Sequence, residues 1–322
     1  MRRKTGIIIT NTGTPDAPTT AAVRRYLREF LSDKRVVKIP RLIWLPILYL
    51  FILTLRPRKS AALYQKIWAA NDSPMRLIMQ SIRDKLQQKC SETNPELYVE
   101  FGMNYGRPSI PEALTKLRSK NIDKLIVIPL FPQYSNSTTA SSYDRLQQDL
   151  KTWPSLPSLN FIREYSSNHL YISALAESVR EFWRKHGTSE HLLISFHGLP
   201  KRFAEAGDPY PLQCEQTAQL LADALQLAAD KWTLCYQSQF GYDKWLQPST
   251  QVLFKQLPKQ GIYNIDVICP GFSADCLETL EEIAIRGKND FIASGGRNLR
   301  LIPSLNDNTQ HIDILNSLID KM

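Results

Sequence analysis

His197 is the residue whose type and setting point most directly to chemistry. It follows the apolar run 192–196, so it is expected at the carboxyl end of a β-strand. An imidazole there can accept a proton near neutral pH or ligate a divalent metal ion. A buried histidine that only holds a turn has the same signature and, on this motif alone, is the commoner case. His169, His186, His191 and His311 lie among polar residues and are expected at the surface.

Carboxylates gather in a second segment, residues 275–282. Asp275 is expected to cap the start of a helix. On that helix Glu278 and Glu282 would share one face, which Arg286 would continue. For Glu282 and Arg286 an ordinary surface ion pair is the simpler interpretation. Glu278 differs, because it lies nearest the strand end and beside leucines. One carboxylate near an imidazole could take a hydrated cation and exchange its waters, whereas four protein ligands would trap it.

The sequence pattern around these residues predicts an α/β fold. Short β-rich runs alternate with longer helical patterns, which predicts βαβ units and parallel sheets. The runs are continuous and apolar, as expected for strands covered by helices on both faces. The six runs are 6–11, 97–103, 125–128, 192–196, 232–236 and 265–269.

A faint internal repeat relates the two halves of the chain. Three pairs of segments carry Gly, Pro or aromatic residues at matching places after a predicted strand: 11–15 with 196–200, 102–106 with 237–241, and 127–131 with 268–272. The repeat predicts a duplicated α/β domain, with residues 1–165 in the first copy and 166–322 in the second. The terminal helix could pack back on the first domain. Ligands of such sheets bind at the carboxyl ends of the strands, where all three pairs lie.

The two copies differ in the chemistry they carry. Thr12 in the first copy matches His197 in the second. After the third pair, the first copy continues with hydroxyl side chains and the second with carboxylates. The reactive groups are therefore expected in the second half.

The composition narrows the partners. Lys and Arg total 40 against 31 Asp and Glu, a net charge of +9 that favours an anionic partner such as nucleic acid, a membrane surface or a carboxylate ligand. The five cysteines are scattered without a C-x-x-C motif, which favours a reducing cytosol over a disulfide framework or a zinc or iron-sulfur site. The apolar run after the first basic residues is too short for a secretory signal, so a cytoplasmic location is expected.

An apolar stretch at 42–55 contains no charge but is shorter than the roughly 18 to 20 residues that span a bilayer. Pro46 interrupts it, and basic residues flank it on both sides. Two interpretations stay open: a segment lying in an anionic membrane interface, or a buried core helix.

The sequence resembles the ferrochelatase family over most of its length, from about residue 6 to residue 302. Six motifs in the order of that family carry the resemblance: 11–16, 26–33, 102–108, 132–135, 195–200 and 270–282. The resemblance implies two similar Rossmann-like domains with parallel sheets and an active-site cleft between them. It also implies that an insertion at 34–75 forms an apolar lip, which admits the porphyrin and touches the membrane.

The resemblance also implies roles for single residues. His197 matches the active-site histidine, and Glu278 matches the glutamate on the metal side. Tyr105 and Trp245 match aromatic residues that line the pocket. Cys276 stands where some members of the family have a histidine.

Further roles follow from the same resemblance. Arg56, Lys59 and Ser73 fall near positions that meet the porphyrin propionates. Asp275 and Glu282, behind the metal-side glutamate, would carry protons away or guide iron in.

The implied activity is insertion of ferrous iron into protoporphyrin IX to give protohaem and two protons, a lyase reaction that ends haem biosynthesis. Iron is then a substrate, and neither a permanently bound cofactor nor an iron-sulfur cluster is expected. A monomer in peripheral contact with a membrane is the expected state. Two alternatives are a coproporphyrin ferrochelatase and a tetrapyrrole-binding protein without catalysis. Nucleic-acid binding ranks below these, because the basic residues bracket an apolar run instead of alternating with aromatic residues.

Overall fold

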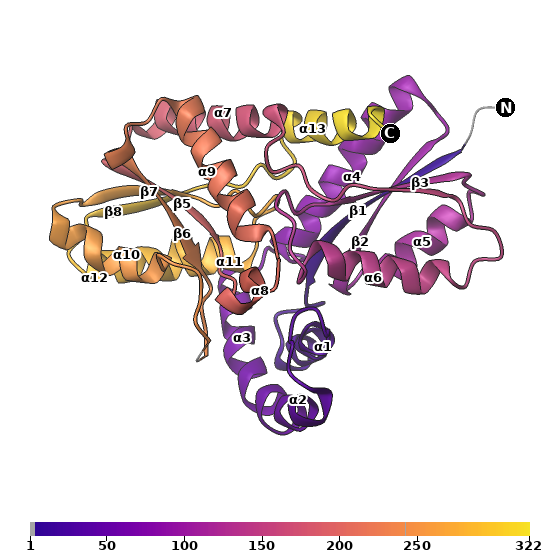
Figure 1. The fold of residues 1–322 in the computed structure, drawn as a ribbon, viewed down its shortest axis with the longest axis horizontal. Helices are drawn as coiled ribbons and strands as arrows, with labels where there is room; N and C mark the ends of the chain where they lie inside the picture. Colours follow the sequence, from indigo (N-terminus) through magenta and orange to yellow (C-terminus); the bar gives the residue numbers. More distant parts are fainter. Residues whose placement is uncertain (1–3, 242) are drawn as a thin grey trace. The chain divides into compact units, whose positions relative to one another are not determined.

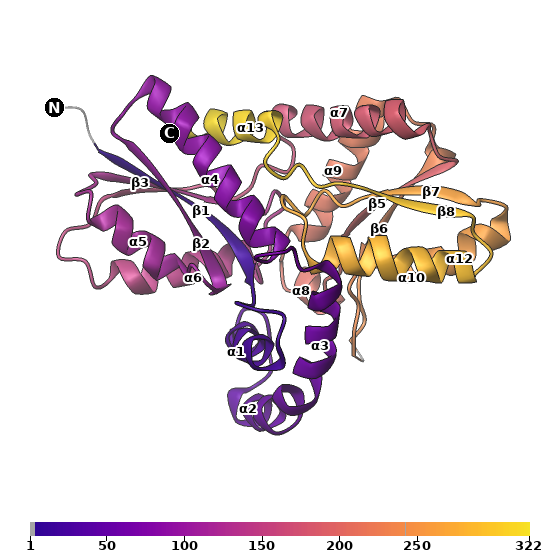
Figure 2. The same cartoon turned by 180° about the vertical axis from the view of Figure 1, so that it is seen from behind.

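The computed structural model describes residues 4–241 and 243–322 (Figures 1 and 2). The chain forms two compact units. Unit 1 holds the residues up to Phe131, Ser135–Glu164 and Ile312–Met322, and unit 2 holds Pro132–Tyr134 and Tyr165–His311.

Unit 1 is built on a parallel sheet of four strands in the order β2-β1-β3-β4. The central strand is apolar on both faces, and Ile7, Ile8 and Ile9 are fully buried in it. Helices α5 and α6 cover one face, and α4 with α13 lies over the other (Figures 1 and 2). The strands are β1 Thr5–Thr14, β2 Leu97–Gly106, β3 Lys124–Pro129 and β4 Ser158–Phe161. The helices on the faces are α4 Pro74–Thr93, α5 Ile110–Arg118, α6 Thr139–Leu150 and α13 Thr309–Asp320.

The connection from β1 to β2 in unit 1 carries the apolar stretch. It forms α1 Thr20–Leu31, α2 Arg41–Ile47, a π-helix at Leu48–Ile52, and α3 Leu53–Ile67. Leu48 and Leu53 are buried, but Leu42 is 92% exposed, Leu50 65% and Leu55 69%. The stretch is therefore not a buried core helix: one side packs and the other is open. In the part of the chain that the structure describes, the helices are too short or too polar to cross a membrane.

Unit 2 repeats the plan, with four parallel strands in the order β6-β5-β7-β8. Helices α10 and α12 lie on one face, and α7 and α9 on the other (Figure 1). The strands are β5 His191–His197, β6 Trp232–Gln237, β7 Asn264–Ile268 and β8 Asn298–Ile302. The α-helices are α7 His169–His186, α8 Lys201–Glu205, α9 Tyr210–Leu225, α10 Thr250–Gln256, α11 Leu277–Thr279 and α12 Lys288–Ala293. A π-helix, η4, spans Leu280–Gly287, and 3-10 turns span Ala229–Lys231 and Leu257–Gln260.

The prediction of an α/β fold with two similar parallel sheets is confirmed, since the two sheets have matching strand orders and all six predicted runs form strands. The sequence did not reveal β4 and β8, the fourth strand of each sheet. Both are short and lie at a sheet edge, and polar residues interrupt the apolar pattern of each strand.

A further repeated corner strengthens the duplication. The backbone N–H of Met103 donates to the carbonyl of Pro108 at 2.7 Å, and that of Tyr236 donates to Pro248 at 2.9 Å. In each copy a serine follows the proline and stands at the start of the next helix.

This corner corrects the alignment of the second pair of repeat segments. Because Met103 and Tyr236 make equivalent bonds, Asn104 is the counterpart of Gln237. The sequence alignment matched Asn104 with Gln239 instead, an error of two residues.

Candidate active site

His197 ends β5 in unit 2 and is half-buried. Its Nδ1 lies 2.7 Å from the carbonyl oxygen of Gly198. A carbonyl can only accept, so Nδ1 carries the hydrogen, and in the neutral ring Nε2 is left as a proton acceptor. The backbone carbonyl of His197 accepts a hydrogen bond from the Tyr210 hydroxyl at 3.1 Å, and the ring centroid lies 6.3 Å from that of Phe272. The turn and the tautomer are thus fixed by local contacts.

Glu278 lies in the first turn of α11 and is half-buried. Its backbone carbonyl accepts a hydrogen bond from the side-chain amide of Gln237 at 2.7 Å. The Cys276 thiol lies near enough to Glu278 to sense its charge. Burial, and then the Glu278 charge, raise the pKa of Cys276 well above its usual value, so this sulfur stays a neutral thiol. The carboxylate has no nearby thiolate to compete for a cation.

Asp275 is buried, and its carboxylate holds a neighbouring loop in place. It accepts hydrogen bonds from the Thr279 hydroxyl at 2.9 Å, the Asn306 amide at 2.7 Å and the Ser304 backbone N–H at 3.3 Å. The prediction that Asp275 caps the helix is wrong, because the N-cap residue is Cys276.

Glu282 is also buried and accepts hydrogen bonds from neutral donors. Ser238 donates to it twice, from its backbone N–H at 2.8 Å and its hydroxyl at 2.5 Å, and the Gln251 amide donates at 2.5 Å. Ser238 has a left-handed backbone with φ of +62°. Glu282 therefore holds an uncommon turn at the end of β6.

The expected pair between Glu282 and Arg286 does not form. Arg286 instead meets Glu281 at 3.3 Å. The segment is a π-helix, in which residues five apart align, whereas the prediction assumed α-helical spacing of four. The α-helix that was expected to carry Glu278 and Glu282 on one face ends at Thr279.

Trp245 is half-buried and packs against the turn that follows His197. Its indole N–H donates to the carbonyl of Phe240 at 3.0 Å. A Cβ on Gly198 would lie 2.6 Å from the carbonyl oxygen of Gln237 and 3.1 Å from the Trp245 ring. Only glycine fits this contact, which explains the glycine of the His-Gly-x-Pro motif.

In unit 1, Tyr105 near the end of β2 is almost fully buried. Its hydroxyl bonds to the Asp33 carboxylate at 2.8 Å and to Ser141 at 2.9 Å, and the Arg145 guanidinium lies 4.6 Å from its ring centroid. Burial and the Asp33 charge raise the pKa of Tyr105, so the hydroxyl stays protonated.

The three residues expected near the propionates also lie in unit 1. Arg56 and Lys59 are exposed on α3, one turn apart. Ser73 is buried at the N-cap of α4, where its backbone N–H donates to Asp72 at 2.6 Å.

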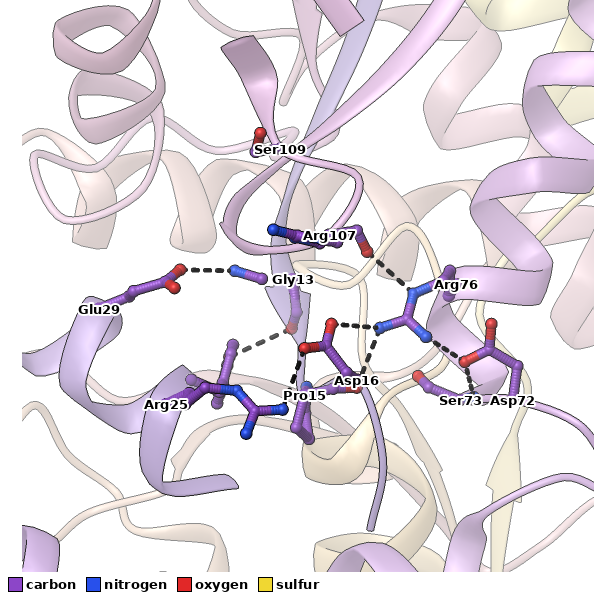
Figure 3. A network of polar contacts seen from close by, with 12 residues as sticks. Gly13, Pro15, Asp16, Arg25, Glu29, Asp72, Ser73, Arg76, Arg107 and Ser109 are labelled. Atoms are coloured by element: carbon purple, nitrogen blue, oxygen red, sulfur yellow. Dashed lines mark hydrogen bonds and ion pairs between the residues drawn. The ribbon is translucent and has the colours of Figure 1, made fainter. Parts of the chain in front are cut away.

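Arg76 ties together the loops around Ser73 (Figure 3). Its guanidinium pairs with Asp72 and donates to the carbonyls of Arg107 at 2.9 Å and Pro15 at 3.0 Å. One half-buried side chain thus joins the loops after β1 and β2 to the start of α4.

Among the residues that the structure describes, no group of three or more His, Cys, Asp and Glu side chains forms a metal cluster. Unit 2 carries His197, Trp245, Asp275, Glu278 and Glu282, and unit 1 carries the other four candidates.

Two of the histidines expected at the surface are buried. His191 bonds through its ring to the Asp230 carbonyl and the Thr233 hydroxyl, and His311 bonds to the Asn306 carbonyl. Burial lowers the pKa of both rings. Polar neighbours in sequence therefore misled the prediction, since each ring finds its partners inside unit 2.

The model of one protein family, described as ferrochelatase, matches residues 4–322. The chain belongs to the ferrochelatase family. The ferrochelatase of Methylococcus capsulatus is 49% identical over 98% of this chain and 96% of its own length. The ferrochelatase of Aeromonas hydrophila is 48% identical over 99% and 98%, and that of Yersinia pestis 47% over 99% and 98%.

Distant solved structures share the fold of this ferrochelatase-family chain. SirB from Bacillus subtilis with Fe3+ matches with a TM-score of 0.58 at 10% identity, over 99% of this chain and 95% of that one. The chelatase-like protein DR2241 from Deinococcus radiodurans matches with a TM-score of 0.53 at 10% identity, over 98% and 55%. At such identities the likeness concerns the fold alone.

Sequence reasoning missed Gln237 as part of the ferrochelatase-family site. The sequence placed it only within a repeat segment, but the structure bonds it to the backbone of both Glu278 and Gly198. The Pro-Ser pair at 108–109 and 248–249 did not give this alignment, because the second copy has seven more residues than the first between the pair and this position.

Proposed function

We propose that the protein inserts ferrous iron into protoporphyrin IX, forming protohaem and releasing two protons. Membership of the ferrochelatase family supports this activity. The observation that carries the proposal is the hydrogen bond from His197 Nδ1 to Gly198, because it leaves Nε2 as a ready proton acceptor.

His197 would take a pyrrole proton. The free-base macrocycle carries two N–H groups, and both protons leave as Fe2+ enters, so charge balances. A neutral imidazole can accept one proton and then release it to solvent. A protein pocket that favours a distorted macrocycle would lower the barrier, because a flat ring cannot receive the ion.

Glu278 would meet the iron or the second proton. Asp275 and Glu282 lie on either side of it in the chain and accept hydrogen bonds from neutral donors, which do not cancel a carboxylate charge. Together these charges would draw a divalent cation or departing protons toward Glu278. This supports the proposal that they form a path for protons or metal.

The propionates would meet positive charge in unit 1. Arg56 and Lys59 are exposed on α3 and can each pair with a carboxylate. Ser73, at the N-cap of α4 beside the loops that Arg76 joins, would add a hydroxyl. Tyr105 and Trp245 would supply aromatic contacts to the macrocycle.

The exposed apolar side chains on α2, the π-helix and α3 would touch a membrane. Leu42, Leu50, Phe51 and Leu55 are each more than half exposed, and lysines and arginines flank the segment. Apolar side chains with flanking cations suit the surface of an anionic bilayer, where a sparingly soluble porphyrin would arrive. We therefore favour a cytoplasmic monomer in peripheral contact with a membrane.

The test mixes purified protein, Fe2+ and protoporphyrin without oxygen and follows the change from free-base to metalloporphyrin absorption. The variants His197→Ala and Glu278→Gln should each lose most of the turnover, and near-normal turnover in either would remove that residue from its role. A parallel assay with coproporphyrin identifies the preferred porphyrin. Porphyrin binding without turnover would instead indicate a tetrapyrrole carrier.

A further inference from the structure

Gln237, the last residue of β6, is fully buried and uses both ends of its side-chain amide. Its Nε2 donates to the backbone carbonyl of Glu278 at 2.7 Å. Its Oε1 accepts from the Ser195 hydroxyl at 2.9 Å and from the Cys269 thiol at 3.4 Å. One side chain thus joins the ends of β5 and β7 to the first turn that carries Glu278.

The backbone of Gln237 reaches His197 as well. His197 and Gln237 are partners in the register of β5 and β6. The N–H of Gly198 donates to the Gln237 carbonyl at 2.7 Å, and the carbonyl of the same Gly198 accepts from His197 Nδ1. Three hydrogen bonds, joined through Gly198 and Gln237, therefore connect the His197 ring to the Glu278 peptide.

The glutamine amide meets both hydrogen-bonding requirements of this position. The Glu278 carbonyl accepts from this side chain, while the Ser195 hydroxyl and the Cys269 thiol donate to it. The Ser195 hydroxyl also bonds to the Thr250 hydroxyl at 2.9 Å. A primary amide offers both functions, whereas leucine offers neither and an ionised glutamate only accepts. In unit 1 the counterpart Asn104 accepts a hydrogen bond from Ser142 at 2.8 Å, in the copy that has no histidine.

A second tie lies beside the first. Ser238, in its left-handed conformation, binds the Glu282 carboxylate through its backbone and its hydroxyl. The segment that carries Glu278 is therefore attached to the end of β6 at two successive residues. Movement of Glu278 relative to His197 would have to break one of these ties.

We infer that Gln237 is a positioning residue, which sets the separation and orientation of Glu278 and His197. The inference rests on the proposed function and deepens it, because it assigns a role to a side chain that need not touch the porphyrin or the iron. A small misplacement of reacting groups costs much of the rate, so the effect should appear in kcat.

The main test compares Gln237→Leu and Gln237→Glu with wild type in the iron-insertion assay. Gln237→Leu should lower kcat on the order of 10- to 100-fold and leave the KM for porphyrin within about twofold. Gln237→Glu adds a pH signature. A protonated carboxyl donates to the Glu278 carbonyl and an ionised one cannot, so kcat of this variant should be partly rescued at low pH and fall as pH rises. A merely structural role would not produce this extra limb in the pH profile.

Ser195→Ala is the matched control. It removes one donor to Gln237 in the same buried network but leaves the bond to Glu278 intact. It should lose some stability and keep kcat. Equal kcat losses in Ser195→Ala and Gln237→Leu would overturn the inference, as would wild-type kcat in a folded Gln237→Leu protein. If Gln237→Leu fails to fold, Gln237→Asn, which keeps the amide but is one methylene shorter, takes its place.

Hydrogen exchange separates this inference from the proposed function. In Gln237→Leu, or in Gln237→Asn where it is used instead, amides of residues 276–284 should exchange at least tenfold faster than in Ser195→Ala. Unchanged exchange would overturn the inference even if the enzyme is active. If wild type forms no metalloporphyrin, the proposed function fails, while faster exchange would still support Gln237 as the residue that fixes the Glu278 turn.

Discussion

The Glu282 carboxylate accepts two hydrogen bonds from Ser238, the residue with φ of +62° at the end of β6. The left-handed region costs a residue with a Cβ about 1 kcal/mol or more, so this turn persists because its partners hold it.

Replacing Ser238 therefore separates the hydrogen bond from the backbone cost. Ser238→Ala should lower the free energy of unfolding by about 2 kcal/mol, because the buried Glu282 carboxylate loses the hydroxyl donor while it keeps the Ser238 N–H and the Gln251 amide. Ser238→Gly loses the same donor but gains freedom in the left-handed region, so it should be about 1 kcal/mol more stable than the alanine variant. Urea titrations of the three proteins measure this. Alanine equal to or better than glycine would contradict the conformational argument.

Gly198→Ala should damage both stability and turnover. Its Cβ would lie 2.6 Å from the Gln237 carbonyl oxygen, so the turn that carries His197 must shift. The expected loss of stability is about 1–3 kcal/mol. Gly271→Ala is the control, because the nearest atom there is an ordinary 3.5 Å away and the backbone is not left-handed. Thermal unfolding midpoints and kcat report the outcome, and a harmless Gly198→Ala would remove the steric account of the motif.

Acid should destabilise unit 2 through its buried histidines. Burial lowers the pKa of His191 in the folded chain below its unfolded value of about 6.5. Below that pH the unfolded chain binds more protons, so the free energy of unfolding falls as pH drops. His191→Gln should make stability less dependent on pH between about 7 and 5. The exposed His169→Gln should keep the wild-type slope, and an identical slope in both variants would refute the prediction.

Charge on the exposed side of the lip should weaken binding to vesicles. Leu50 and Phe51 are 65% and 59% exposed, so glutamate at either position should change the free energy of unfolding by no more than about 0.5 kcal/mol. Binding to vesicles that contain anionic lipid should fall severalfold. Leu212→Glu, at a 70% exposed position on α9, serves as control and should bind like wild type. Equal binding by all these proteins would exclude the lip as the contact.

The central strands were predictable because they are buried on both faces. The run Ile7 to Ile9 shows the reason, since continuous β-branched residues leave few alternatives. The edge strand β8 was not predicted, because Arg300 interrupts its apolar pattern. The Arg300 guanidinium pairs with the buried Asp266. This ion pair joins two strands that are distant in sequence, so a local sequence pattern does not indicate it.

The candidate site was predictable only in part, for a similar reason. His197 and Glu278 stand in recognisable motifs, but the partner of Arg286 depends on a π-helical turn that α-helical spacing does not indicate. Gln237 was missed because a glutamine acquires its role from three other strands and turns, which only the folded chain brings within reach.

The hydrogen bond from His197 to the adjacent Gly198 has one more consequence. Both atoms belong to neighbouring residues of one turn, so the imidazole acquires its orientation when unit 2 folds, before any porphyrin arrives. If His197 is the base that we propose, porphyrin binding need not select its rotamer or tautomer, because Nε2 already presents its lone pair. Such a base would be preorganised by its own main chain.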